Sequence, residues 1–216
     1  MLIQRRHFNA LCLGAAVLGL GSPARAQKSP PVVLVVGDSL SAEYGLVRGQ
    51  GWVALLEQRL KSLRSRLQVV NASISGDTTS GGRSRLPTLL RTHKPSVVVI
   101  ELGGNDALRG LPLDVSRANL QAMIEASQQA GAKVLLVGME MPPNYGARYA
   151  EQFRQLYVDL ARQKRVPLVP FFLKGIADRT DAMDFFQADR IHPNEAAQPK
   201  MLDNVWPALQ PLLPRS

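Results

Sequence analysis

The hydrophobic positions of the chain fall into five short, nearly continuous apolar runs, which are separated by longer segments with helical periodicity. The runs consist mainly of Val, Leu and Ile, a composition typical of strands that are covered by helices on both faces. We expect strands at residues 32–36, 67–70, 97–102, 133–137 and 166–170. The pattern therefore indicates a sheet with two buried faces.

The intervening segments predict helices, because their apolar residues recur at intervals of three and four. We expect helices at residues 51–63, 114–130, 147–165 and 194–213, with a further helical segment that ends at His93. Asp114 is expected to cap the start of one helix, and Gly131 is expected to stop it. Alternating strands and helices with right-handed crossovers predict an α/β fold, with a five-stranded parallel sheet in a three-layer α/β/α sandwich.

The first 26 residues have the pattern of a segment that is removed during export. Arg5-Arg6 precedes an uncharged stretch at residues 10–21, and Ala24-Arg25-Ala26 follows it. A basic start, a short apolar core and a small-residue end are typical of a secretory signal peptide, and the arginine pair also fits a twin-arginine signal. Twelve residues are too few to cross a hydrocarbon core of ~30 Å. We therefore predict a signal peptide at residues 1–26 and a single periplasmic or secreted domain at residues 27–216.

Composition and charge narrow the possible classes of protein. The chain carries 26 Lys and Arg against 17 Asp and Glu, a net charge of +9, and a single cysteine. One cysteine excludes an internal disulfide framework and any multi-cysteine metal site. Residues 48–94 hold nine basic residues against two acidic ones, so most of the basic excess is local. Such a segment is either a solvated face or a surface that modestly steers anionic substrates, and it does not predict a nucleic-acid partner.

Polar, glycine-rich segments follow the expected strands. They are Gly37-Asp38-Ser39-Leu40-Ser41, residues 71–77, Gly103-Gly104-Asn105-Asp106 and, before the last helix, Asp189-Arg190-Ile191-His192-Pro193. The carboxyl ends of parallel strands lie at one edge of a sheet, where sites of such folds form. The four segments are therefore expected to build one site.

Among the three histidines, His192 is the candidate for a catalytic acid or base. His7 lies in the predicted signal peptide, and His93 lies between basic residues just before Pro95, which favours a solvated surface position. The unperturbed pKa of histidine, ~6.5, suits proton transfer near neutral pH. Asp189, three residues before His192, can reach the imidazole, fix its tautomer and stabilise its charged form.

Ser39 is the candidate nucleophile, because it follows the first strand at a turn that presents its hydroxyl at the sheet edge. A plain turn role remains the alternative, and Asp38 is expected to act as a turn or capping residue. Ser41, Ser73 and Ser75 are rival hydroxyls. The order Ser, Asp, His without a G-x-S-x-G motif weighs against an α/β-hydrolase elbow.

Acyl transfer also requires hydrogen-bond donors for the oxyanion that develops on the substrate. The candidates are the backbone N–H of Gly76, the side-chain amide of Asn105 and the backbone N–H of Ser39. The alternative interpretations are a turn role for Gly76 and a capping role for Asn105.

These four blocks resemble the GDSL, or SGNH, hydrolase family, whose name lists the Ser, Gly, Asn and His that are here Ser39, Gly76, Asn105 and His192. The stretches GDSLSAEYG, NASISGDT, ELGGNDALRG, NYGARY, VPLVPFF and IHPNEAAQP are similar to a branch of periplasmic acyl-CoA thioesterases and lysophospholipases. The resemblance spans essentially the whole predicted domain. It implies a flavodoxin-like fold, a triad of Ser39, Asp189 and His192, and an oxyanion hole from Ser39, Gly76 and Asn105.

The resemblance also implies broad activity on esters and thioesters of fatty acyl groups, including lysophospholipids, without a cofactor or metal. It implies small-molecule acyl substrates. The local distribution of charge predicts no nucleic-acid partner, the short apolar stretch at residues 10–21 predicts no stable membrane anchor, and the lack of an exposed apolar stripe predicts a monomer. An esterase for aryl or acetylated-carbohydrate esters is the alternative within the family. Glu43 stands where this branch usually carries glycine, a change near the nucleophile that can alter substrate range.

Position in the chain suggests further residues for the acyl chain. The tentative substrate contacts are Leu108, Leu111, Pro112, Pro143 and Tyr145, and plain surface loops explain these residues equally well.

A dinuclear metallophosphoesterase is disfavoured, because two histidines in the predicted domain cannot supply its ligands. A non-enzymatic binding module is a further alternative, which labelling of Ser39 by a fluorophosphonate would exclude. No P-loop or dinucleotide fingerprint is present.

Overall fold

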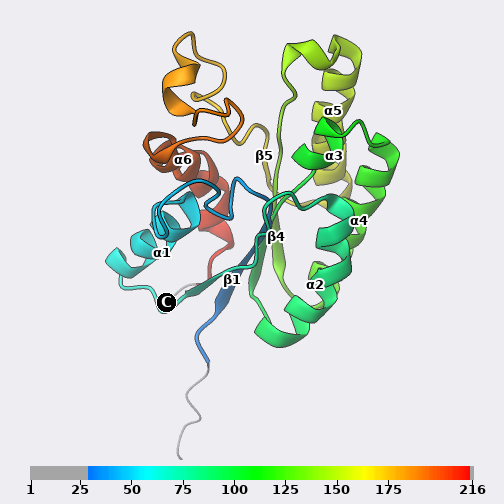
Figure 1. Cartoon of the computed structure of the whole chain (residues 1–216). Coiled ribbons are helices and arrows are strands. Elements are labelled where there is room, and N and C mark those ends of the chain that lie inside the picture. The colour runs from blue at the N-terminus through cyan, green and yellow to red at the C-terminus, as the bar shows by residue number, and fades with distance from the viewer. Residues whose placement is uncertain (1–28, 215–216) are drawn as a thin grey trace, which may run out of the picture.

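The computed structural model describes residues 29–214, so the predicted signal peptide lies outside the described residues (Figure 1). The strands are β1 Val32–Gly37, β2 Gln68–Asn71, β3 Val97–Glu101, β4 Lys133–Val137 and β5 Leu168–Val169. The α-helices are α1 Trp52–Ser62, α2 Thr79–His93, α3 Gly104–Leu108, α4 Leu113–Gln129, α5 Ala147–Lys164 and α6 Gln198–Leu209. Four short 3₁₀ segments are η1 Pro143–Tyr145, η2 Ala182–Phe185, η3 Glu195–Ala197 and η4 Gln210–Leu212.

The five strands form one parallel sheet in the order β2-β1-β3-β4-β5, which confirms the predicted fold class. In the register, Leu34 of β1 lies opposite Val70 of β2 on one side and Val98 of β3 on the other. Within residues 29–214, none of the helices combines the length and apolar character needed to cross a membrane.

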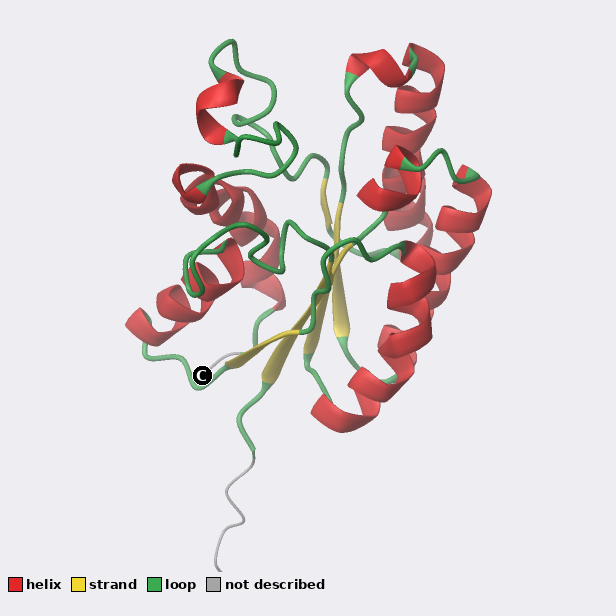
Figure 2. Cartoon of the chain, in the orientation of Figure 1, coloured by secondary structure: helices red, strands yellow, loops and turns green. Residues whose placement is uncertain are grey.

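Helices cover both faces of the sheet, as Figures 1 and 2 show. Alternate residues of each central strand point to opposite faces. Leu34, Ile100 and Leu136 pack with α2, α4 and α5, whereas Val35, Val99 and Leu135 pack with α1 and α6. Each strand thus contributes to two cores, which explains why its sequence is apolar at nearly every position.

Several element boundaries differ from the sequence prediction. β5 has two residues instead of five, and the predicted helix 194–213 is divided into η3, α6 and η4. The side chain of Asn194 accepts the Ala196 N–H and begins η3, and a proline lies in the first turn of both α6 and η4. Asp114 lies in the first turn of α4 and is not its N-cap, which is Pro112.

The short helix α3 was not predicted and lies where a loop was expected to begin. It follows Gly103, whose φ of 120° is in the region that favours glycine. A Cβ at Gly103 would lie 2.3 Å from the Tyr157 hydroxyl oxygen, so a larger residue cannot make this turn without displacing Tyr157. The tight turn places Asn105 at the carboxyl edge of the sheet.

Candidate active site

Ser39, His192 and Asp189 form a hydrogen-bonded chain at the carboxyl edge of the sheet. Ser39 lies just after β1, and the other two lie in the connection between β5 and α6. The Ser39 Oγ is 2.9 Å from Nε2 of His192, and Nδ1 of His192 is 2.6 Å from Oδ2 of Asp189. The structure therefore brings together three side chains that are up to 153 residues apart in sequence.

Asp189 is held by its own turn in the orientation that reaches the imidazole. Its Oδ1 accepts the backbone N–H groups of Ile191 and His192 at 2.9 and 3.0 Å. The backbone N–H of His192 and the imidazole lower the pKa of Asp189 to about 2 from its usual 3.8. An ionised Asp189 keeps the Nδ1 proton facing it, so Nε2 is free to accept the proton of Ser39.

The rival hydroxyls and the other histidine have different surroundings. Ser41 is buried, and its Oγ donates to Glu101 at 2.7 Å. The Oγ of Ser73 is buried without a hydrogen-bond partner among the described residues. His93 is half-buried at the last position of α2, at the opposite edge of the sheet. Within residues 29–214, Ser39 is the serine whose hydroxyl is bonded to an imidazole.

The three candidate oxyanion donors lie on the loops after β1, β2 and β3. Asn105, in α3, directs Nδ2 toward Oδ2 of Asp38 at 3.1 Å and the carbonyl oxygen of Asp77 at 3.0 Å. Gly76 has a φ of 77°, and Arg109 donates to its carbonyl oxygen at 2.9 Å. In the described part of the chain, the N–H groups of Ser39 and Gly76 have no acceptor. Both N–H groups are therefore available to a ligand.

Two buried carboxyl groups lie behind these donors, and sequence reasoning missed their role. Asp38 accepts the Leu40 N–H at 3.0 Å, as expected of a turn residue, and it also holds Asn105. Burial raises the pKa of Asp38 to about 6. Burial, together with the nearby Asp38, raises the pKa of Glu101 well above its usual range. The detectable signal was an acidic residue, Glu101, inside a run predicted to be buried on both faces.

A third buried carboxyl group, that of Asp106, fixes the helix that carries Asn105. It accepts the N–H and the hydroxyl of Thr79 at 2.8 and 2.5 Å, and the hydroxyl of Ser116 at 3.2 Å. These bonds join the start of α2, the start of α4 and α3. The position of Asn105 is therefore set by packing among three helices.

Arg85 of α2 connects the ends of β1 and β2 beneath the site. Its guanidinium donates to Oδ2 of Asp77 at 2.8 Å, to the carbonyl oxygen of Gly37 at 3.3 Å and to that of Ala72. The residue is largely buried, as is Asp77. This arrangement braces the loop that carries Gly76.

The tentative acyl-chain residues lie on the connections that follow β3 and β4. Leu108, Leu111 and Tyr145 are between 38% and 41% exposed, and Pro112 is also exposed, whereas the side chain of Pro143 lies outside the described residues. The Tyr149 hydroxyl of α5 donates to the carbonyl oxygen of Leu111 at 3.3 Å, so the connection after β3 contacts the start of α5. A role for these residues in binding stays a prediction.

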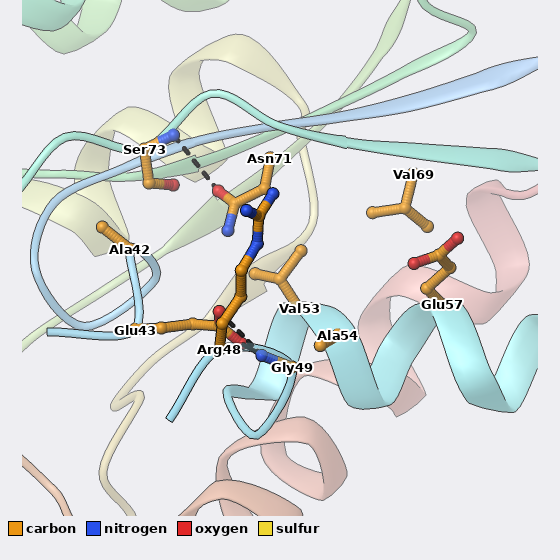
Figure 3. Close-up of a pocket in the computed structure, with 10 residues that line it drawn as sticks. All are labelled: Ala42, Glu43, Arg48, Gly49, Val53, Ala54, Glu57, Val69, Asn71 and Ser73. Carbon is orange, nitrogen blue, oxygen red and sulfur yellow. Dashed lines mark hydrogen bonds between the residues drawn. The ribbon is translucent and has the colours of Figure 1, made fainter. Parts of the chain in front are cut away.

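Glu43 occupies a conformation that explains why glycine suits its position. Its φ is 59°, and its carboxylate accepts the N–H groups of Gly49 and Gly51 at 3.0 and 2.8 Å. Glu43 also lines a surface pocket of about 400 Å³, shown in Figure 3, between α1, β2 and the loop after β1. None of the tentative acyl-chain residues lines this pocket. Residues 29–214 contain no group of His, Cys, Asp and Glu side chains placed to hold a metal ion.

Comparisons with known proteins show the family to which the chain belongs. Residues 35–198 match the GDSL-like lipase/acylhydrolase family. The esterase TesA of Pseudomonas aeruginosa is 54% identical, covering 87% of this chain and 92% of the relative. The thioesterase 1/protease 1/lysophospholipase L1 of Escherichia coli K12 is 44% identical over 84% of each chain. An arylesterase of Vibrio mimicus is 42% identical over 83% of this chain and 88% of the relative.

A solved structure shows the same fold. The crystal structure of TesA superposes with a TM-score of 0.80 at 54% identity, covering 84% of this chain and 99% of that chain. The region matched by the family, residues 35–198, includes the loops after β1, β2 and β3 and extends to the first residue of α6. The family match covers more than half of the chain, and three relatives exceed 40% identity over most of their length. The chain therefore belongs to the GDSL-like lipase/acylhydrolase family and is an esterase of the SGNH type.

Proposed function

We propose that the protein is an exported serine hydrolase that cleaves esters and thioesters of fatty acyl groups through an acyl-enzyme on Ser39. The observation that carries the proposal is the chain of hydrogen bonds from Ser39 through His192 to an ionised Asp189. The substrate class is supported by a relative named as a thioesterase and lysophospholipase.

In the first step, Nε2 of His192 takes the hydroxyl proton of Ser39 as Oγ attacks the acyl carbon. The carbonyl π electrons move to oxygen, which gives a tetrahedral oxyanion. The imidazolium then gives its proton to the departing alcohol or thiol, and the acyl group remains on Oγ. Asp189 stabilises the imidazolium and stays ionised throughout.

In the second step, a water molecule enters where the alcohol or thiol left, and the same proton transfers take place. His192 removes a proton from the water as its oxygen attacks the acyl-enzyme, and it returns that proton to Oγ when the bond to Ser39 breaks. The products are a free fatty acid and regenerated Ser39. No redox change occurs in either step.

The oxyanion of both steps is placed near the N–H groups of Ser39 and Gly76 and the amide of Asn105. Such donors stabilise charge that appears only in the transition state. The acyl chain is assigned to the exposed apolar side chains of Leu108, Leu111 and Tyr145. Leu108 and Leu111 follow Asn105 in the chain, and Tyr145 follows β4, the strand beside β3. A long chain would lie across this surface and bury it.

The decisive experiment compares the wild-type protein with Ser39→Ala on acyl-CoA, lysophospholipid and p-nitrophenyl esters. We expect kcat to fall on the order of 10⁶-fold in the variant, with little change in unfolding temperature. A fluorophosphonate should label the wild-type protein once, at Ser39. Near-normal turnover by Ser39→Ala would exclude the proposal.

The same substrates separate this proposal from the arylesterase activity named for the Vibrio relative. A fatty acyl hydrolase should show kcat/KM that rises with acyl-chain length, and Leu108→Ala with Leu111→Ala should flatten that rise. An aryl or acetyl esterase should prefer the shortest acyl group and be insensitive to both changes.

The export step is tested by mass spectrometry of the protein recovered from the periplasm. The recovered chain should begin at Gln27.

A further inference from the structure

An aromatic side chain lies against the face of the imidazole and has no part in the mechanism above. The ring of Tyr44 has its centroid 4.3 Å from that of His192, with 38° between the ring planes. Tyr44 is 50% exposed, whereas the His192 side chain is 18% exposed. Tyr44 therefore covers the imidazole from solvent without being part of either core.

The backbone of Tyr44 is tied directly to the loop that carries His192. Nε2 of Gln187 donates to the carbonyl oxygen of Tyr44 at 2.8 Å and to that of Pro193 at 3.1 Å. The backbone N–H of Gln187 donates to the carbonyl oxygen of His192 at 2.8 Å. One residue thus fixes the spacing between the two rings.

The residues beside Tyr44 favour the same arrangement. Glu43 anchors the loop by accepting the Gly49 and Gly51 N–H groups. A Cβ at Gly45 would lie 1.9 Å from Oε1 of Gln187, so a larger residue at position 45 would displace the Gln187 side chain. The contact between the two rings is therefore supported by residues on both sides of Tyr44.

We infer that Tyr44 is a positioning residue that holds the His192 ring in line with Ser39 and stabilises its positively charged form through the π face. The inference rests on the proposed function, because it assigns a second partner to the same base. An aromatic face attracts a cation by about 0.5–1 kcal/mol at an exposed site, which corresponds to about a two- to fivefold change in rate. The charge on His192 exists only between proton uptake and release, so the contact favours the transition state over the resting enzyme.

The charged and titratable groups around His192 are few, which makes the effect of Tyr44 measurable. Asp189 contacts Nδ1, Ser39 contacts Nε2, Tyr44 covers the face, and the buried Asp38 acts through space. Arg190 lies in the same turn as His192 and is exposed. A substitution at Tyr44 leaves Asp189, Ser39 and Asp38 as they are.

The test compares Tyr44→Phe, Tyr44→Leu and Tyr44→Ala in the whole domain, residues 27–216. Phe keeps the aromatic face, Leu keeps an apolar cover without one, and Ala removes both. We expect Phe to behave like the wild type, and Leu to shift the acidic limb of kcat/KM to lower pH by about half a pH unit. Leu should also reduce kcat/KM about two- to fivefold at neutral pH. Gln187→Met, which keeps the ring but loses both side-chain bonds, should shift the limb in the same direction.

The imidazole of His192 is also titrated by NMR in the resting protein, without any substrate. The midpoint should move to lower pH in Leu but not in Phe, and the ring-current displacement of the imidazole protons should disappear in Leu. Identical midpoints in all variants, or a shift to higher pH in Leu, would overturn the inference. Because this readout needs no turnover, it also separates failure of the Tyr44 role from failure of the esterase proposal, which Ser39→Ala tests.

Discussion

Asp38 shows how a single buried carboxyl group links the stability of this fold to its site. It is 3% exposed, and its partners are the Leu40 N–H and the Asn105 amide. Burial raises the pKa of Asp38 from 3.8 to about 6, so the folded protein binds a proton more tightly than the unfolded chain does. Its ionisation is retained although it opposes folding, because an ionised Asp38 orients Asn105.

We expect Asp38→Asn to raise stability at pH 8 relative to the wild type, and to do so less at pH 4.5. As pH rises from about 4 to about 6, the wild-type contribution of Asp38 falls, by on the order of 3 kcal/mol for a shift of this size. Urea unfolding at the two pH values measures the difference. Asp178, an exposed carboxylate whose pKa is lowered by Lys174, provides the control, because Asp178→Asn should show the opposite pH trend. Equal effects of Asp38→Asn at both pH values would contradict the assignment.

Asn105 is the proposed oxyanion donor whose side chain can be removed without altering the backbone. Both of its amide hydrogens already face acceptors, Asp38 and the carbonyl oxygen of Asp77, so the oxyanion must share one of them. Asn105→Ala should lower kcat about 10²–10³-fold with a small change in KM. Asn105→Asp should be worse than Ala, because it places a carboxylate beside both Asp38 and the oxyanion. If Asn105→Asp were more active than Asn105→Ala, the assignment of Asn105 to the oxyanion hole would be contradicted.

At the scale of elements, the loop between β1 and α1 depends on an uncommon backbone conformation at Glu43. A non-glycine residue with φ near 59° is strained by about 1–2 kcal/mol. This strain is offset by the hydrogen bonds that the Glu43 carboxylate accepts from the N–H groups of Gly49 and Gly51. Gly51 must lack a side chain, since a Cβ there would lie 2.6 Å from Cγ of Glu43.

Glu43→Gly should therefore be more stable than Glu43→Ala by about 1 kcal/mol, because both lose the carboxylate but only Ala keeps the strain. Urea unfolding of the two variants measures this order. The exposed Glu140 does not have a positive φ, and it offers a matched pair in which Ala should be the more stable variant, because Gly increases the conformational entropy of the unfolded chain. If Glu43→Ala were as stable as Glu43→Gly, or more stable, the presence of backbone strain at position 43 would be contradicted.

The elements also show how far sequence could predict this molecule. The strands and the loops after them were predictable, because double burial leaves an apolar run and a site needs polar residues where that run ends. The short helix α3 was not, since Gly103 reads equally well as a turn glycine. The support from Asp106, Arg85 and Gln187 was also hidden, because it depends on contacts between segments that are distant in sequence. Glu101 was the exception, as an acid within an apolar run.

At the scale of the whole molecule, the basic segment 48–94 turns out to be divided between the two edges of the sheet. Arg64, Arg66, Arg91 and Lys94 lie at the carboxyl ends of α1 and α2, at the edge away from the site. Positive charge there complements the helix dipole. Arg85 is committed to Asp77, and Arg59 to Asp203. Among the described residues of this segment, the exposed cations at the catalytic edge are Arg48 on a loop and Arg83 near the start of α2, which donates to the neutral side chain of Asn119.

This distribution predicts weak electrostatic steering of anionic substrates. A strand of five residues spans ~17 Å, about twice the Debye length of ~8 Å at physiological salt, so charges at the far edge are screened from the site. The ratio of kcat/KM for acyl-CoA to that for a neutral p-nitrophenyl ester should change less than about twofold between roughly 0.05 and 0.3 M salt. Arg64→Glu should leave this ratio unaltered, whereas Arg48→Glu should lower it through a local contact. A tenfold or larger loss in Arg64→Glu, on the order expected of long-range steering, would show that the field of the whole molecule reaches the substrate.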